Sequence, residues 1–209
     1  KPFGLDAHFI GHPEAFGDFL PAKPAGKTIK EPRTKFNKII LLTGSRRSEI
    51  SLILPEMLAA TAIIKRHDPN LNFVLPTVPH LLPLIESLVE GSGVTILDQP
   101  EDLVPALQTS DAMIATSGTI TLQAALCGTV GVTCYITGAF SGFIGRRVVD
   151  LDKVILPNAI LGRPLYPFYF QEAATGKTLA AATLDCLYDA NAKSSARHAA
   201  IELKSLLTG

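Results

Sequence analysis

The sequence has no tryptophan, two methionines and three cysteines, and charged residues make up only 18% of its 209 residues. Lysine and arginine total 19 and are balanced by 19 aspartate and glutamate residues. This composition excludes a disordered chain, a strongly basic nucleic-acid-binding protein and an acidic tail. The cysteines lack metal-ligand spacing, and the five histidines recur at no fixed interval. Metal and Ser-His-Asp chemistry is therefore disfavoured, and we expect Cys127, Cys134 and Cys186 to be reduced core thiols of a cytosolic protein.

Long hydrophobic runs are also lacking, since no uninterrupted run of hydrophobic residues exceeds four. The 34 residues of segment 112–145 carry no charge and no histidine, but Gly, Ser and Thr interrupt the segment throughout. This pattern is typical of elements buried inside a protein and not of a membrane-spanning helix. The length and the 47% hydrophobic content favour one large domain with a substantial core.

Strand and helix patterns alternate along the chain. Short apolar runs typical of buried strands occur at 38–42, 72–78, 94–98, 112–116, 130–136 and 153–156. Helical spacing predicts helices at 49–67, 81–90, 101–108, 119–127, 140–150, 178–188 and 194–207. Pro55 falls inside the first helix, where we expect a kink or a break. The alternation predicts an α/β fold, a Rossmann-like doubly wound parallel sheet with helices on both faces.

Composition divides the chain into three parts. Residues 1–36 are aperiodic and rich in proline, which is typical of a crossover and linker, and 37–190 hold the predicted sheet domain. Residues 191–209 form a C-terminal helix that we expect to pack on an N-terminal domain or a partner chain. The chain begins at Lys1 without an initiator Met, so we expect a segment before it. Eight Lys and Arg residues fall between Lys23 and Glu49; the lysines favour a solvated linker, and the arginines an anion site.

In open parallel sheets, ligands bind beyond the carboxyl ends of the strands, at the topological switch point. The first predicted strand is followed by Gly44, Ser45 and Arg46. A glycine lets the backbone approach a ligand, a helix N-terminus offers free amides, and a guanidinium can grip phosphate, so this turn is a candidate diphosphate cradle. It lacks both the Walker A and the G-x-G-x-x-G pattern. The alternative is an ordinary helix cap by Ser45 or Ser48.

A second candidate turn follows the fourth predicted strand. Ser117, Gly118 and Thr119 again place hydroxyls, a glycine and free amides at a helix start. Gln123 lies one helical turn beyond Thr119, where its amide could reach a sugar hydroxyl; a surface glutamine is the alternative. Two such turns in one sheet favour a phosphate-binding site more strongly than either alone.

Two further polar residues are candidates near the end of the predicted sheet. Asn158 follows the last predicted strand, and Gln171 ends an aromatic-rich segment, 166–171, that we expect to be a loop. Both side chains could pair with a base or a sugar. The alternative is that they cap loop backbone, the commoner use of Asn in such a position.

Taken together, these motifs resemble the C-terminal, nucleotide-sugar-binding half of lipid-A-disaccharide synthase, a family of bacterial GT-B glycosyltransferases with two Rossmann-like domains. The strings that carry the resemblance are Gly11-His12-Pro13, Leu42 to Ile50, Ser117 to Leu122, Leu156-Pro157-Asn158 and Gln171. The resemblance implies transfer of 2,3-diacylglucosamine from UDP-2,3-diacylglucosamine to 2,3-diacylglucosamine 1-phosphate, with release of UDP, in lipid A biosynthesis. It implies no metal and no other cofactor.

The resemblance also implies residue roles. The Gly44, Ser45 and Arg46 turn would hold the diphosphate. Phosphate or sugar would be held by Ser117, Gly118 and Thr119, and the donor site would be lined by Asn158 and Gln171. The catalytic base would lie in the N-terminal half, which these residues do not include, so we expect this chain alone to bind nucleotide without turnover.

Location and partners follow from the acylated substrates. The resemblance implies a cytoplasmic protein peripheral to the inner membrane, with no nucleic-acid partner, and it leaves a homodimer open. One candidate membrane patch combines apolar and basic residues of the predicted helix at 140–150, although a core-facing helix fits them better. The residues of this patch are Phe140, Phe143, Ile144, Arg146 and Arg147.

The chain departs from the family pattern at three positions. The family has Pro at the position of Thr43, Glu at Gln123 and commonly Glu at Phe168. An amide accepts hydrogen bonds from ribose more weakly than a carboxylate, so donor affinity is lower, the donor differs, or the protein is a diverged relative with little activity. Two alternatives therefore stay open: another nucleotide-sugar transferase or epimerase of this architecture, and a UDP-sugar-binding or scaffold protein without activity.

Overall fold

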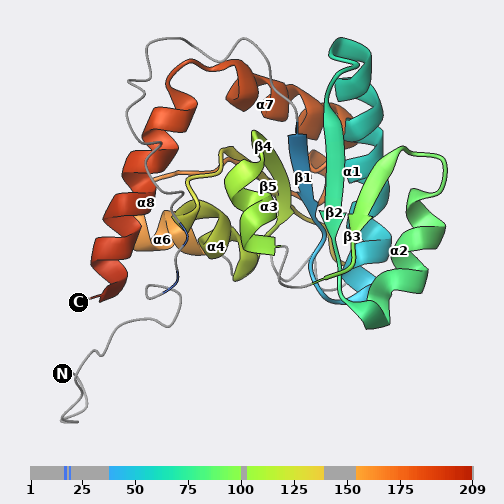
Figure 1. Cartoon of the computed structure of the whole chain (residues 1–209), viewed down its shortest axis with the longest axis horizontal. Coiled ribbons are helices and arrows are strands. Elements are labelled where there is room, and N and C mark those ends of the chain that lie inside the picture. Colours follow the sequence, from blue (N-terminus) through green and yellow to red (C-terminus); the bar gives the residue numbers. More distant parts are fainter. Residues whose placement is uncertain (1–16, 18, 20–37, 100–102, 139–153, 209) are drawn as a thin grey trace.

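The computed structural model describes residues 17, 19, 38–99, 103–138 and 154–208, which form a parallel sheet between two layers of helices (Figure 1). The strands in these residues are β1 (Lys38–Leu42), β2 (Asn72–Pro76), β3 (Val94–Leu97), β4 (Ala112–Thr116), β5 (Gly131–Tyr135) and β6 (Phe168–Phe170). The strand order is β3-β2-β1-β4-β5-β6, and every pairing is parallel. This order reverses between β1 and β4, so the predicted Rossmann-like, doubly wound fold is confirmed and its switch point lies there.

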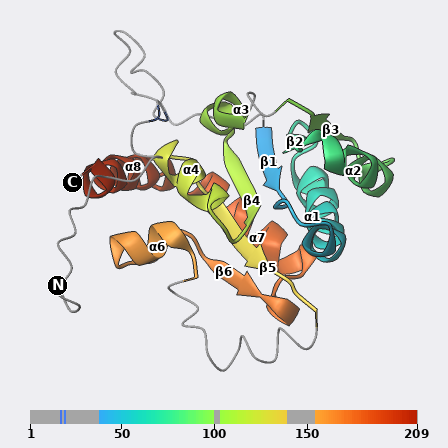
Figure 2. The same ribbon diagram turned by 90° about the horizontal axis from the view of Figure 1, so that it is seen from below.

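Helices cover both faces of the sheet, as Figure 2 shows. On one face lie α1 (Arg47–His67), α2 (Leu82–Val89) and α7 (Gly176–Tyr188), and on the other α3 (Leu103–Thr109), α4 (Ile120–Leu126), α6 (Leu156–Leu161) and α8 (Ala192–Thr208). Successive residues of a strand point to opposite faces, so Ile39 and Leu41 of β1 enter the α1 side of the core and Ile40 and Leu42 enter the α4 side. Two buried faces explain why the strands read as continuous apolar runs.

Pro55 does not split α1, which runs without interruption from Arg47 to His67. The residue lies on the exposed side of the helix, next to exposed Ser51 and Leu52. Water can therefore bond the carbonyl group that proline leaves without a partner. The predicted break is wrong because Ile53, Leu54 and other buried residues hold the opposite face of the helix against the sheet.

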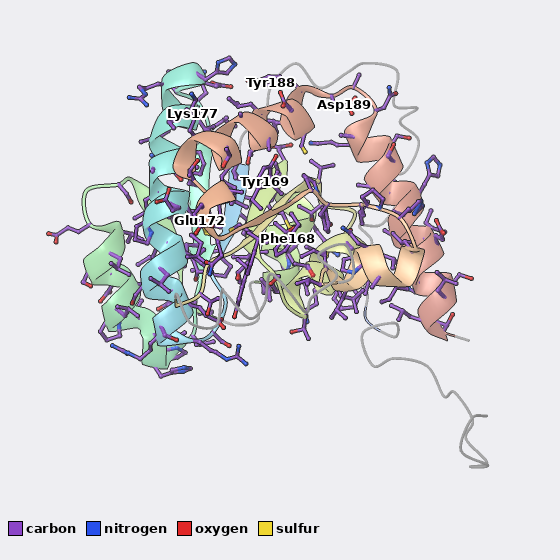
Figure 3. All side chains as sticks on the ribbon, turned by 180° about the vertical axis from the view of Figure 1, so that it is seen from behind. Phe168, Tyr169, Glu172, Lys177, Tyr188 and Asp189 are labelled. Carbon is purple, nitrogen blue, oxygen red and sulfur yellow. The ribbon has the colours of Figure 1, made fainter. Side chains whose placement is uncertain are left out.

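The last predicted strand, at 153–156, is also wrong, since α6 begins at Leu156 with Pro157 in its first turn. Proline suits a first turn because its missing amide would have no partner inside the helix. The strand that completes the sheet is β6, inside the segment expected to be a loop, with Phe168 and Tyr169 labelled in Figure 3. Its three residues are too few to show a periodic pattern.

A buried acid secures the amino ends of the strands. Asp111 is 2% exposed and accepts hydrogen bonds from the Lys38 backbone amide at 3.2 Å and the Lys193 ammonium group at 2.6 Å. Because Lys193 belongs to α8, this contact ties the last helix to the start of the sheet. Further along, α8 packs on α4 and α6. A contact of residues 191–209 with an N-terminal domain or a second chain stays a prediction.

Several expectations lie outside the described residues: nearly all of segment 1–36, the predicted helix at 140–150 and the candidate membrane patch within it. None of the helices in the described part of the chain combines the length and the apolar character that crossing a bilayer requires.

Candidate functional site

A cleft of about 550 Å³ opens at the carboxyl ends of β1 and β4, at the switch point of the sheet. The two turns singled out in the sequence form opposite parts of its lining. Gly44, Ser45 and Arg46 come from the turn between β1 and α1, and Ser117, Gly118 and Thr119 from the turn between β4 and α4. The structure thus brings six of the nine candidate residues together; their contact with a ligand stays a prediction.

The turn after β1 presents a helix N-terminus to the cleft. Gly44 has a φ of +83°, and a Cβ atom there would lie 3.0 Å from the Thr116 methyl group, so glycine suits this turn for both reasons. Arg46 is the N-cap residue, with extended backbone, and no described side chain caps the helix. The alternative of a cap by Ser45 or Ser48 is therefore not what forms. The first turn of a 21-residue helix keeps its amides and its partial positive charge for a ligand.

A hydrogen-bonded group of three side chains borders this turn. Glu49, only 13% exposed, accepts at Oε1 from Arg46 Nη1 at 2.8 Å and from the Tyr135 hydroxyl at 2.7 Å. The hydrogen bond with Glu49 raises the pKa of the Arg46 guanidinium. The pKa of the Tyr135 hydroxyl is also raised, chiefly because the group is partly buried and secondly because it donates to the Glu49 carboxylate. The arginine is therefore a permanent cation whose side chain is 74% exposed and free to turn toward a bound anion.

The turn after β4 is built on neighbouring strands. The Ser117 amide donates to the Cys134 carbonyl group of β5 at 3.0 Å, and the Thr121 hydroxyl donates to the Gly118 carbonyl group at 2.7 Å. Gly118 and Thr119 themselves are exposed. Gln123 lies half-buried one turn further along α4 and is not among the residues that line the cleft. Its contact with a sugar hydroxyl stays a prediction.

Asn158 and Gln171 are buried and do not line the cleft. Asn158 Oδ1 accepts from the amides of Leu165 at 2.9 Å and Tyr166 at 3.0 Å, and its Nδ2 donates to the Tyr166 carbonyl group. Gln171 pairs with the amide and the carbonyl group of Thr137, both at 3.1 Å. These bonds are those of the alternative, loop capping, and the structure does not bring either residue to the cleft lining; their contact with a donor stays a prediction.

Thr116 and Glu49 line the cleft but were not among the nine candidate residues, and neither was Tyr135, which hydrogen-bonds to Glu49 beside the lining. Thr116 ends β4, Tyr135 ends β5 and Glu49 lies in the first turn of α1. The strand-end rule that selected Ser117 could have selected Thr116 and Tyr135 as well. The bond between Tyr135 and Glu49 joins residues 86 positions apart, and no local pattern predicts it.

The lipid-A-disaccharide synthetase family matches residues 1–207 of the sequence. The chain belongs to this family. Among lipid-A-disaccharide synthases, that of Paraburkholderia phytofirmans is 39% identical over 193 residues and that of Bradyrhizobium diazoefficiens is 31% identical over 193 residues. The first match covers 89% of this chain and 49% of the relative, and the second 90% and 48%. The chain therefore spans about half the length of the synthases it matches.

Solved structures show the same fold at low sequence identity. The glycotransferase of kitacinnamycin matches with a TM-score of 0.56 at 16% identity, covering 91% of this chain and 44% of that one. The calicheamicin glycosyltransferase CalG4 matches with a TM-score of 0.56 at 13% identity, covering 85% and 40%. At this identity the likeness shows the fold alone. The chain has the Rossmann-like fold that these glycosyltransferases contain.

Proposed function

We propose that this chain is the donor-binding half of a lipid-A-disaccharide synthase. The complete enzyme transfers 2,3-diacylglucosamine from its UDP-linked form to 2,3-diacylglucosamine 1-phosphate and releases UDP. The observation that carries the proposal is the cleft in which the two predicted phosphate-binding turns meet. Membership of the synthetase family supports the choice of substrates and disfavours a binding protein without activity.

The chemistry of the cleft suits a nucleoside diphosphate. Its volume of about 550 Å³ lies within the range of small-molecule sites. The α1 N-terminus and Arg46 supply positive charge, while the carboxylate in the lining, that of Glu49, already accepts from Arg46 and Tyr135. A diphosphate can therefore enter without facing an unpaired acid.

The same groups would favour the reaction. Negative charge builds on the departing UDP as the bond between its phosphate oxygen and the anomeric carbon of the donor sugar breaks. Fixed amides and a guanidinium stabilise that charge in the transition state. A carboxylate of the preceding domain would take the proton from the acceptor 6-hydroxyl. This division of labour explains why we expect the chain alone to bind UDP and not to turn over.

The acylated substrates place the work of the complete enzyme at a membrane surface. We propose a peripheral cytoplasmic enzyme at the inner membrane, with a homodimer as one assembly to be tested. Co-sedimentation of the complete protein with anionic vesicles measures the first and light scattering the second. A protein that stays in the supernatant would contradict the membrane proposal.

Nucleotide selectivity tests the proposed function directly. Calorimetric titration of the chain with UDP, ADP and GDP should show binding of UDP and clearly weaker binding of the two purine nucleotides. The complete protein should form disaccharide from the two acylated substrates. Absence of UDP binding, or equal affinity for the three nucleotides, would refute the proposal.

A further inference from the structure

One buried hydroxyl group at the cleft lacks a hydrogen bond. Thr116, the last residue of β4, is 3% exposed, and its Oγ1 atom has no partner in the described part of the chain. A buried polar group without a partner destabilises a folded protein, and native structures rarely retain one. An unpaired group that persists in a binding cleft indicates a partner that arrives with the ligand.

Two buried threonines elsewhere in the fold satisfy their hydroxyl groups. Thr133 donates to the Pro167 carbonyl group at 2.8 Å, and Thr183 donates to the Leu179 carbonyl group at 2.7 Å. Thr116 thus differs from these two threonines, and unlike them it lines the cleft.

The position of the methyl group shows how the hydroxyl could reach a ligand. The Thr116 Cγ2 atom lies under the Gly44 turn, 3.0 Å from where a Cβ atom of residue 44 would stand, and both residues line the cleft. The methyl group therefore faces the turn while the hydroxyl is closed off from solvent. Staggered rotamers of threonine differ by about 120°. One such rotation about the Cα–Cβ bond can therefore place the hydroxyl group where the methyl group now lies, at the Gly44 turn.

We propose that the Thr116 hydroxyl donates a hydrogen bond to a phosphoryl oxygen of the bound nucleoside diphosphate, after a rotamer change that brings it toward the Gly44 turn. The proposal rests on the proposed function and adds a binding residue to it. An anionic oxygen is the expected acceptor because the same turn offers the α1 amides and Arg46. Binding then gives the hydroxyl the partner that it lacks among the described residues of the free protein.

Two substitutions separate this role from packing. Thr116→Val keeps the shape and the methyl group but removes the hydroxyl, and we expect it to weaken UDP binding about tenfold or more. The melting temperature of the free variant should stay the same or rise by about 2–4 °C, since an unpaired buried hydroxyl is removed. Thr116→Ser keeps the hydroxyl and should bind UDP within about threefold of the unchanged chain.

A matched control is Thr183→Val, the same change in a buried threonine of α7 that does not line the cleft. This variant should bind UDP like the unchanged chain. Inorganic pyrophosphate and uridine serve as partial ligands: Thr116→Val should weaken binding of pyrophosphate and leave that of uridine unchanged. Three-bond couplings at Thr116, measured by NMR with and without UDP, should report the rotamer change.

The outcomes separate the two proposals. If Thr116→Val binds UDP as tightly as the unchanged chain while Arg46→Ala binds it more weakly, the role of Thr116 is overturned and the proposed function stands. If the loss in Thr116→Val extends equally to uridine, the contact with phosphate is overturned. If the unchanged chain binds no UDP, the proposed function fails and this inference with it.

Discussion

Arg46 offers the most direct test of the cleft. Its side chain is 74% exposed and its Nη1 atom lies 2.8 Å from Glu49 Oε1. A charge-assisted contact with a diphosphate raises affinity by about tenfold to a hundredfold. Sharing or breaking an exposed ion pair offsets about one- to fivefold of that gain. We therefore expect Arg46→Ala to weaken UDP binding about tenfold.

The charge of Glu49 adds a second expectation to this experiment. In Arg46→Ala the carboxylate still accepts from Tyr135 but has lost its cation, so its charge repels the diphosphate. The double variant Arg46→Ala with Glu49→Gln removes that repulsion and should recover about threefold of the affinity. A double variant that binds no better than Arg46→Ala would show that the carboxylate lies too far from the ligand.

Calorimetry at about 0.15 M salt is the assay, and Arg47→Ala is the matched control. Arg47 is exposed and begins α1, but it does not line the cleft. Its removal should change UDP affinity by less than about twofold. Unchanged UDP affinity in Arg46→Ala would refute the assignment of the cleft as the UDP site. Equal losses of affinity in the two variants would show that only the net positive charge matters and not a contact made by Arg46.

Three other expectations concern the helices and the core. Gln123→Glu should tighten UDP binding several-fold in the same titration, because a carboxylate accepts more strongly from ribose; weaker or unchanged binding would show that the ribose contact is misassigned. Gly176→Ala should cost about 1–3 kcal/mol in urea unfolding, since its Cβ atom would lie 2.5 Å from a methyl carbon of α1, whereas Gly138→Ala, with open space around it, should be neutral. Burial raises the pKa of Cys127 and Cys134 from 9.0 to about 12. These thiols therefore lose their protons at lower pH in the unfolded chain than in the folded one, and the free energy of unfolding should fall as the pH rises above about 9. A free energy of unfolding that stays constant from pH 8 to about 10.5 would contradict this.

Much of the fold was predictable because each of the first five strands is a short apolar run followed by a helical pattern. The strands at 38–42 and 112–116 were predicted with their observed bounds, and the other three within two residues. The sixth strand was missed for a physical reason. Its three residues follow Pro167, and among the described strands only β5 pairs with it, so tertiary contact and not local sequence makes it a strand.

The candidate site was predictable to the extent that it follows strand ends. Gly44 and Ser117 were found because parallel strands deliver their carboxyl ends to one edge. Asn158 and Gln171 were selected by residue type and by resemblance, and in the structure their side-chain amides pair with the backbone of Tyr166 and Thr137. The unpaired hydroxyl of Thr116 could not be predicted, because the absence of a partner depends on the whole surrounding structure.

The two ends of the strands carry different features, a stabilising buried ion pair at one end and the cleft at the other. The buried contact of Asp111 with Lys193 lies at the amino ends, and the cleft lies at the carboxyl ends, with the length of β4 between them, about 16 Å for five residues. Changes at sites this far apart add independently. Substitutions near Asp111 should therefore change the stability of the sheet without changing the affinity of the cleft for a ligand. Evolution and protein engineering can thus alter stability and binding separately within one domain.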